Sequence, residues 1–440
     1  MAEIPKFEVE FTKDGQVFDT KQVDAVLASL PQFSDLIIFS HGWNNDKADA
    51  RALSNDFLAK AQDVLDGGII PGAQGRTFGA VIVLWPSKKF TDEELIPGGG
   101  AATTQLQEDF APVERILEEL KNDPERLGET NVTETRNLLM EQAKKLLPQL
   151  KANAGARLQY VSLLRTLVAP DDAHADDGSL EFFTSDPEQM FKNMSDSVAA
   201  PVGPNPGGSA RLAGQPGGAA GLKDIVDGVM GAARRIANFT TYYQMKERAG
   251  LVGRAGLSQV VRRIRQQRPA IRLHLVGHSF GGRLVTAAAN ALDPNTGSVT
   301  LTLLQAAYSH NGLAQEFDGT NDGFFRKLIS EKRASGPIVV THTKNDTAVG
   351  IAYPLASRLS GTKASAIGDE NDPYGGLGRN GALHTPEAKG LAQALADLPA
   401  PYEFISGKVY NLRADRFIRD HNDICKQEVA YAMLMAAIAV

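Results

Sequence analysis

Residues 271–285, with the sequence IRLHLVGHSFGGRLV, contain the pattern that decides the fold of this chain. An apolar run over 271–276 leads into Gly277-His278-Ser279-Phe280-Gly281-Gly282, after which apolar residues recur at helical spacing to about residue 292. A sharp turn from strand to helix brings its flanks close together, so the residues on either side of the serine must be small. Such a turn would lift the Ser279 hydroxyl above the carboxyl end of the strand. We therefore predict that Ser279 is a catalytic nucleophile.

Similar apolar runs recur along the chain at residues 36–39, 80–84, 273–276, 299–304 and 337–340. They are aliphatic, often β-branched and nearly continuous, which is typical of parallel strands covered by helices on both faces. Helical patterns separate them, for example at residues 48–65 and 282–292. Alternation of strand and helix predicts an α/β fold with a doubly wound, mostly parallel sheet.

The two ends of the chain give two further expectations. Residues 7–11 alternate in polarity, meet Asp14-Gly15 and continue at residues 16–18, which is a hairpin pattern. We therefore expect the sheet to begin with an antiparallel edge. The apolar residues 431–440 are too few to span a bilayer and predict a buried final helix over about 428–437.

The alternation is interrupted between residues 84 and 271, where no convincing strand pattern occurs. Helical patterns lie at 112–121, 134–151 and 157–167, and again at 222–249 and 257–267. Between them, residues 201–221 are rich in Gly, Pro and Ala, and we expect this stretch to be flexible. We predict that residues 1–87 and 221–440 form the core and that residues 88–220 form a helical cap over the sheet. A separate helical domain with its own partner is the alternative.

The loop after the run at 36–40 has the residues expected of an oxyanion loop. An acyl-transfer enzyme needs two N–H donors, and the first should be the backbone N–H of Phe280, directly after the serine. The loop contains His41-Gly42-Trp43-Asn44-Asn45, in which Gly42 allows the backbone to turn an amide toward the site. We predict the N–H of Trp43 as the second donor, with His41 bracing the loop rather than acting as general base.

The order of residues along the chain selects the acid and the base. In the predicted type of fold, the nucleophile comes first, then the acid, then the histidine. Asp346 follows the strand at 337–340 and would fix and stabilise the catalytic imidazole. His421 follows the predicted last strand, at about 408–412, and is the expected base. His384 lies in an insertion before that strand and is the alternative base.

Other acidic residues and histidines near these positions have lesser expected roles. Asp415, Asp420 and Asp423 are the fallback acids if Asp346 fails. We expect His278 to point away from the serine and His342 to be structural.

These landmarks resemble the α/β-hydrolase superfamily over about residues 36–87 and 271–440. The more specific likeness is to poorly characterised bacterial hydrolases with a His-Gly-aromatic-Asn loop. The matching segments are Ser40-His41-Gly42-Trp43-Asn44, Leu84-Trp85-Pro86-Ser87, Gly277-His278-Ser279-Phe280-Gly281 and His421-Asn422-Asp423-Ile424. The resemblance implies an α/β-hydrolase fold, a Ser279–Asp346–His421 triad and hydrolysis of carboxylic esters. Residues 88–250 depart from the family pattern, so the acyl chain and the leaving group stay open.

Three alternatives remain: a peptidase or amidase on the same triad, a lipase, and a non-catalytic interaction module on a hydrolase scaffold. Residues 114–145 are dense in charge, which indicates solvated helix faces and ranks a lipase below a carboxylesterase.

Composition limits the classes of partner. The 440 residues are 42% hydrophobic and 22% charged, which is typical of a globular protein with a sizeable core. The net charge of -6 gives no electrostatic case for nucleic acid or an anionic membrane. The single cysteine, Cys425, excludes an intrachain disulfide. The N-terminus lacks a signal-peptide pattern, so we expect a cytoplasmic protein.

No pattern requires a metal or an organic cofactor. The acidic loop at residues 368–376 lacks EF-hand spacing, and we expect it to be solvated. The expected partner is a small-molecule ester, without nucleic acid and without stable membrane insertion.

Overall fold

The computed structural model describes residues 3–87, 110–121, 123–129, 134–195, 228–294, 297–349, 368–388 and 393–440, with residues 359 and 361. Seven strands within these ranges form one sheet in the order β1-β3-β2-β4-β5-β6-β7, and all neighbouring strands are parallel. Each apolar run predicted as a strand overlaps one of them, and the predicted α/β class is confirmed. The strands are β1 (Lys6–Glu10), β2 (Asp35–Ser40), β3 (Phe78–Leu84), β4 (Arg272–His278), β5 (Val299–Leu304), β6 (Ile338–His342) and β7 (Val409–Arg413).

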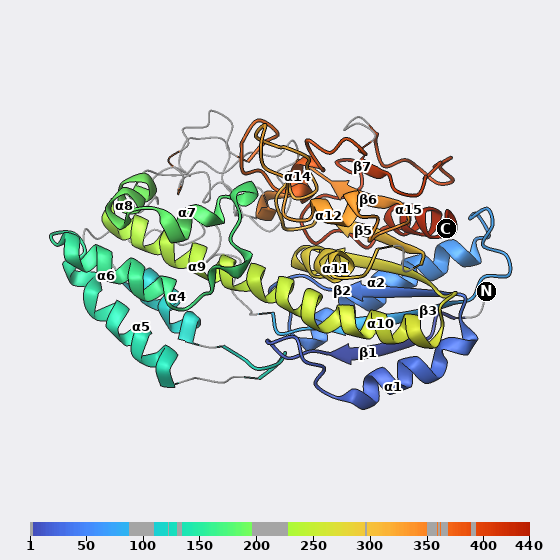
Figure 1. Ribbon diagram of the computed structural model, residues 1–440, viewed down its shortest axis with the longest axis horizontal. Coiled ribbons are helices and arrows are strands. Elements are labelled where there is room, and N and C mark those ends of the chain that lie inside the picture. Colours follow the sequence, from blue (N-terminus) through green and yellow to red (C-terminus); the bar gives the residue numbers. More distant parts are fainter. Residues whose placement is uncertain are drawn as a thin grey trace, which may run out of the picture.

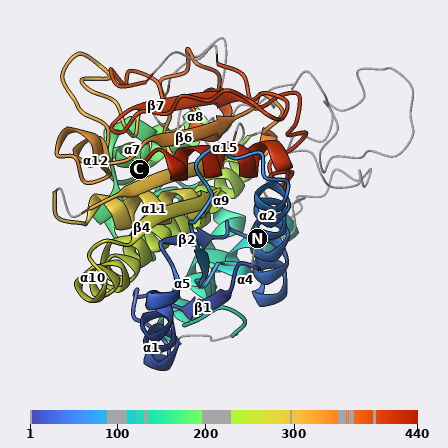
Figure 2. The same ribbon diagram turned by 90° about the vertical axis from the view of Figure 1, so that its right-hand side faces the viewer.

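Helices cover both faces of this sheet, as Figure 2 shows. Leu36 and Ile38 of β2 pack into one apolar cluster, whereas Ile37 and Phe39 pack into a second cluster on the opposite face. Because both faces are buried, the four residues between Asp35 and Ser40 are all apolar, which explains the nearly continuous runs in the sequence. The first face carries α1 (Thr20–Ser29), α10 (Ser258–Gln267), α11 (Phe280–Asn290) and α12 (Arg326–Ser330), and the second carries α2 (Lys47–Asp66) and α15 (Gln427–Ile438).

The N-terminal edge differs from the prediction. β1 lies parallel to β3, and the expected hairpin is reduced to a single antiparallel bridge between Phe11 and Val17. Asp19 caps α1 directly after the turn, and its side chain accepts a hydrogen bond from the N–H of Lys21 at 3.0 Å. The predicted antiparallel edge is wrong because the chain enters a helix before a second strand can extend.

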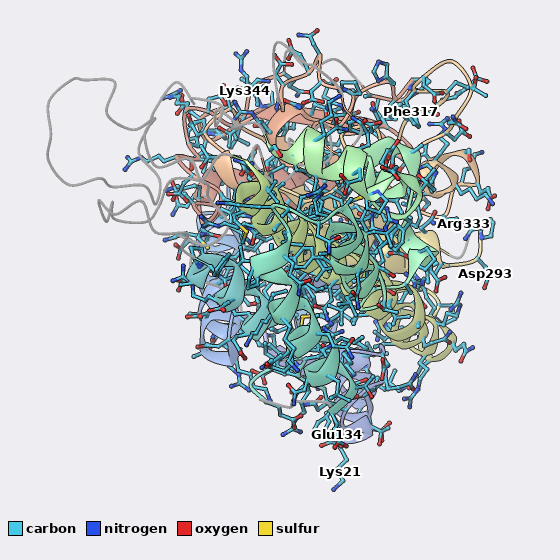
Figure 3. All side chains as sticks on the ribbon, turned by 90° about the vertical axis from the view of Figure 1, so that its left-hand side faces the viewer. Lys21, Glu134, Asp293, Phe317, Arg333 and Lys344 are labelled. Atoms are coloured by element: carbon cyan, nitrogen blue, oxygen red, sulfur yellow. The ribbon has the colours of Figure 1, made fainter. Side chains whose placement is uncertain are left out.

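Five α-helices of the described ranges lie to one side of the sheet, on the left in Figure 1 and toward the viewer in Figure 3. In Figure 3, Glu134 marks the first residue of α5, and Lys344 marks the loop after β6. We call this set the helical layer: α4 (Ala111–Lys121), α5 (Glu134–Leu146), α6 (Ala154–Arg165), α7 (Ser179–Thr184) and α8 (Pro187–Ser195). The helical patterns predicted between residues 112 and 167 correspond to α4, α5 and α6. The stretch predicted to be flexible, residues 201–221, lies outside the described residues.

One long helix, α9 (Val229–Leu251), connects the helical layer to the sheet. It contacts α4, α6 and α8 in the layer and α11 beside the sheet. It continues through a π-helical stretch, η5 (Val252–Leu257), into α10 (Figure 1). Near the carboxyl end of β3, Arg248 of α9 donates to the carbonyl of Pro86 at 3.0 Å. The predicted boundary between cap and core at residue 220 stays a prediction. However, α9, which that boundary assigns to the core, packs against helices of the helical layer.

Buried charges hold α9, α11 and the loop after α6 together. Asp172, in the short helix η3 (Pro170–Asp172), accepts from Arg254 of η5 at 2.7 Å and from Arg283 of α11 at 2.8 Å. Lys246 of α9 donates to the Asp172 carbonyl at 2.8 Å and pairs with Asp177. Charges removed from water are stable only when they are paired, so this network fixes how the three segments pack.

Among the helices that the structure describes, none combines the length and apolar character needed to cross a membrane. The apolar C-terminal residues form α15, whose side chains are mostly buried against α2 and the sheet. The predicted buried final helix is thus confirmed.

Candidate active site

The strand order brings the predicted catalytic loops to one edge of the sheet. From β2 the chain moves to β3 on one side and then returns to β4 on the other, so its direction of winding reverses between β2 and β4. In parallel α/β sheets, ligands commonly bind outside the carboxyl ends of the strands at such a point. The segments that leave these ends here are residues 41–46 after β2 and the turn at Ser279 after β4. β6 and β7 lead to Asp346 and His421 at the same edge.

Ser279 lies in a strained turn between β4 and α11. Its backbone has φ 56° and ψ -125°, a conformation that residues with a side chain rarely adopt. A Cβ atom on Gly277 would lie 2.3 Å from the Gly281 carbonyl oxygen, and one on Gly281 would lie 2.2 Å from the Ser40 carbonyl oxygen. The backbone can approach this closely only with glycine on both sides of the serine. This is the pattern that singled out the position in the sequence.

His421 and Asp346 form a direct hydrogen bond. His421 Nδ1 lies 2.8 Å from Asp346 Oδ2, with the carboxylate side chain fully buried and the imidazole side chain 16% exposed. The other carboxylate oxygen accepts from the N–H of Val349 at 2.9 Å, and Arg379 donates to the Asp346 carbonyl at 3.2 Å. With an ionised Asp346, Nδ1 carries the proton and Nε2 is the basic nitrogen of His421.

The fallback acids have other partners. Asp415 accepts from the N–H of Lys344 at 2.8 Å, which ties the loop after β6 to the segment after β7. Asp420 and Asp423 accept from backbone N–H groups of their own loop, at 2.9 and 3.2 Å. Of the four carboxylates considered, Asp346 is the one bonded to His421 Nδ1.

The other histidines also have defined places. His384, the alternative base, lies with Nδ1 2.8 Å from Asn311 Oδ1. His342 is the last residue of β6, and burial lowers its pKa to about 4, so it is neutral at pH 7. His278 donates from Nε2 to the carbonyl of His421 at 2.8 Å. Sequence reasoning missed that last contact, because the two residues are 143 positions apart and no local pattern reports it.

The loop after β2 is held by its own side chains. His41 is fully buried, donates from Nδ1 to the Gly42 carbonyl at 2.8 Å and accepts at Nε2 from the N–H of Trp85 at 3.4 Å. Burial lowers the pKa of His41 to about 4, so this brace is neutral. Asn45 donates to the carbonyls of Gly42 and Trp43 at 3.1 and 3.0 Å. Because the Gly42 carbonyl faces His41 and Asn45, the N–H of Trp43 in the same trans peptide points the opposite way.

This loop packs directly on the turn that holds Ser279. A Cβ atom on Gly42 would lie 2.6 Å from Ser279 Cβ. The ring of Trp43 meets the ring of Phe280 edge to face, with centroids 5.7 Å apart. The ring of Tyr242 in α9 also contacts the Phe280 ring, with centroids 5.4 Å apart. The two predicted oxyanion residues are therefore in contact, and α9 packs against one of them.

Within the ranges that the structure describes, no group of three or more His, Cys, Asp or Glu side chains is arranged to hold a metal ion. In the acidic loop, Asp372 is buried and accepts from the N–H groups of Gly368 and Tyr374 at 2.7 and 3.0 Å. The expectation that this loop is solvated is wrong for Asp372, because its carboxylate serves the loop's own backbone.

No protein-family model matches the chain, and comparison with curated proteins and with solved structures gives no significant match. The sheet and its covering helices show an α/β fold. Any finer assignment rests on the geometry of the loops at the carboxyl edge.

Proposed function

We propose that the protein is a serine hydrolase of the α/β-hydrolase type that cleaves carboxylic esters through an acyl-enzyme on Ser279. The observation that carries the proposal is the arrival of Ser279, Asp346 and His421 at one edge of a parallel sheet, with His421 bonded to Asp346. Their order along the chain is that of the α/β-hydrolases. In this proposal the helical layer is part of the cap.

In the first half of the proposed reaction, the Ser279 oxygen attacks the ester carbonyl carbon while His421 Nε2 takes the hydroxyl proton. The π electrons of the carbonyl move to its oxygen, which accepts hydrogen bonds from the N–H groups of Phe280 and Trp43. Phe280 is the first residue of α11, so its N–H has no acceptor within the helix, and the helix dipole favours the negative charge.

In the second half, the tetrahedral intermediate collapses and its bond to the alcohol oxygen breaks. The alcohol leaves with the proton from His421. Water then attacks the acyl-enzyme, giving a proton to His421, and the Ser279 oxygen recovers that proton as the acid leaves. Asp346 accepts the Nδ1–H bond throughout and stabilises the imidazolium. Its full burial keeps competing water away from this bond.

A fluorophosphonate probe and p-nitrophenyl esters of graded acyl length test the proposal. We expect the probe to label Ser279, located by mass spectrometry, and Ser279→Ala to lose at least about 10³–10⁴ in kcat/KM. Ser54→Ala is the matched control, since Ser54 is a buried serine of α2 whose hydroxyl donates to the Ala50 carbonyl of its own helix at 2.7 Å. Aminoacyl p-nitroanilides in the same panel distinguish an amidase. Undiminished ester hydrolysis by Ser279→Ala protein would refute the proposal.

A further inference from the structure

His278 lies where three segments of the candidate site meet. It is the last residue of β4, directly before Ser279. Its Nε2 lies 2.8 Å from the His421 carbonyl oxygen, and the two imidazole rings are 4.9 Å apart. Its Nδ1 lies beside the loop after β2, since a Cβ atom on Gly42 would come within 3.1 Å of it. Strand β4, the loop after β7 and the loop after β2 therefore converge on this one side chain.

The contact with His421 defines the hydrogen-bonding state of His278. A backbone carbonyl can only accept a hydrogen bond, so the hydrogen of the neutral ring is on Nε2 and Nδ1 is unprotonated. The side chain is 2% exposed, and Nδ1 has no hydrogen-bond partner among the described residues. Burial, with a smaller contribution from the nearby His421, lowers the pKa of His278 to about 3. His278 is thus a neutral donor that keeps its charge state across the whole neutral range of pH.

The loop that carries His421 lies between the end of β7 and the start of α15 and contains no helix or strand. Its first residues are tied to the loop after β6, because Asn345 donates to the carbonyls of Asp415 and Ile418 at 3.0 and 2.9 Å. Several of its bonds are internal, such as those from the N–H of Asn422 to the Asp420 side chain and from the N–H of Ile424 to the Asn422 carbonyl. The bond from His278 joins this loop to β4 at the main chain of His421, while Asp346 holds the imidazole side chain.

We propose that His278 is a positioning residue, which holds the main chain of His421 so that its imidazole stays aligned between Asp346 and Ser279. The inference rests on the proposed function. It predicts an effect on kcat rather than on KM, because His278 acts through His421 and not through the substrate. A displacement of about 1 Å can cost about 10²-fold in rate, which sets the scale of the expected loss.

Two substitutions separate the donor from the shape of the ring. His278→Phe keeps an aromatic ring and removes the donor, whereas His278→Gln keeps an N–H near the position of Nε2. We expect kcat of His278→Phe to fall about 10–100-fold with KM nearly unchanged, and His278→Gln to recover most of the loss. His274→Phe is the matched control: His274 lies on the same strand, is equally buried and bonds Asp35 and Thr300. This control should lower the melting temperature and leave kcat of the folded protein unchanged.

A second measurement needs no turnover. The Nδ1–H of His421, bonded to Asp346, should give a downfield proton NMR resonance, assigned by its loss in His421→Gln. We expect this resonance to broaden in His278→Phe, because a loosened loop exposes the bond to water. A wild-type protein that shows the resonance but neither labels at Ser279 nor hydrolyses esters would refute the proposed function. The effect of His278→Phe on the resonance would then still test whether His278 positions His421.

Two results would overturn the inference. One is a His278→Phe protein with wild-type kcat and a sharp resonance. The other is an equal loss of kcat and of melting temperature in His278→Phe, His278→Gln and His274→Phe, since the effect would then be on folding alone.

Discussion

Replacing Gly42 with alanine would place a methyl group against the proposed nucleophile. The new Cβ would lie 2.6 Å from Ser279 Cβ and 3.2 Å from the His278 carbonyl oxygen. Carbon atoms in non-bonded contact lie about 3.5–4.0 Å apart, so the loop or the turn must move by about 1 Å. Under the proposed mechanism, such a shift would withdraw the N–H of Trp43 from the oxyanion. We expect kcat/KM to fall by about 10²–10³, the loss typical of one missing oxyanion donor.

The assay for Gly42→Ala is hydrolysis of the best p-nitrophenyl ester, with active sites counted by the fluorophosphonate probe. Gly67→Ala is the matched control, because Gly67 has φ -65° and its Cβ would meet the Asp63 carbonyl oxygen at an ordinary 3.4 Å. The control should retain wild-type kcat/KM. If Gly42→Ala turned over the ester at the wild-type rate while Ser279→Ala did not, the loop after β2 would not be the source of the second donor.

Three further predictions follow from the same contacts. Asp346→Asn should lower kcat by about 10⁴, because an amide no longer enforces the His421 tautomer; steady-state kinetics on protein with unchanged melting checks this, and a loss below tenfold would contradict it. Asp172→Ala should lower the free energy of unfolding by about 3–5 kcal/mol, since Arg254 and Arg283 lose their shared carboxylate. Urea denaturation measures that loss, and a change under about 1 kcal/mol would argue against a stabilising network. Acid should destabilise the fold, because burial holds the pKa of four histidines at about 3 or 4, below the value near 6.5 of an unfolded chain. The unfolded chain then binds protons that the folded chain does not, so stability falls as pH drops from about 6.5 toward 4, by about 1–2 kcal/mol for each histidine between pH 7 and pH 5. Equal urea midpoints at these two pH values would contradict the prediction. The four residues are His41, His278, His310 and His342.

Features set by local sequence could be predicted. The strands are recognisable because both of their faces are buried. The turn at Ser279 is recognisable because a Cβ atom on either flanking glycine would come within 2.5 Å of a carbonyl oxygen, so only glycine fits there. The places of Asp346 and His421 follow from chain order, since each lies after a strand that ends at the same edge of the sheet.

Features set by distant contacts could not be predicted. The direction of β1 depends on its pairing with β3, whereas the turn at Asp14-Gly15 indicated only a local hairpin. Asp172 finds its arginine partners 82 and 111 positions away, and nothing in the local pattern indicates them. The link from His278 to His421 is of the same kind. In each case the contact depends on how segments far apart in the sequence pack together.

The long helix α9 has a consequence for protein engineering. Its residues Phe239 and Tyr243 are buried, and their rings lie 5.3 and 6.4 Å from that of Phe182 in α7. Deleting residues 88–227 would leave these rings facing water as an apolar stripe, which favours aggregation. The same helix supports α11 and touches Phe280 through Tyr242. The smallest unit that can be removed or exchanged without exposing these rings therefore includes α9, and its junction must lie at η5 or beyond.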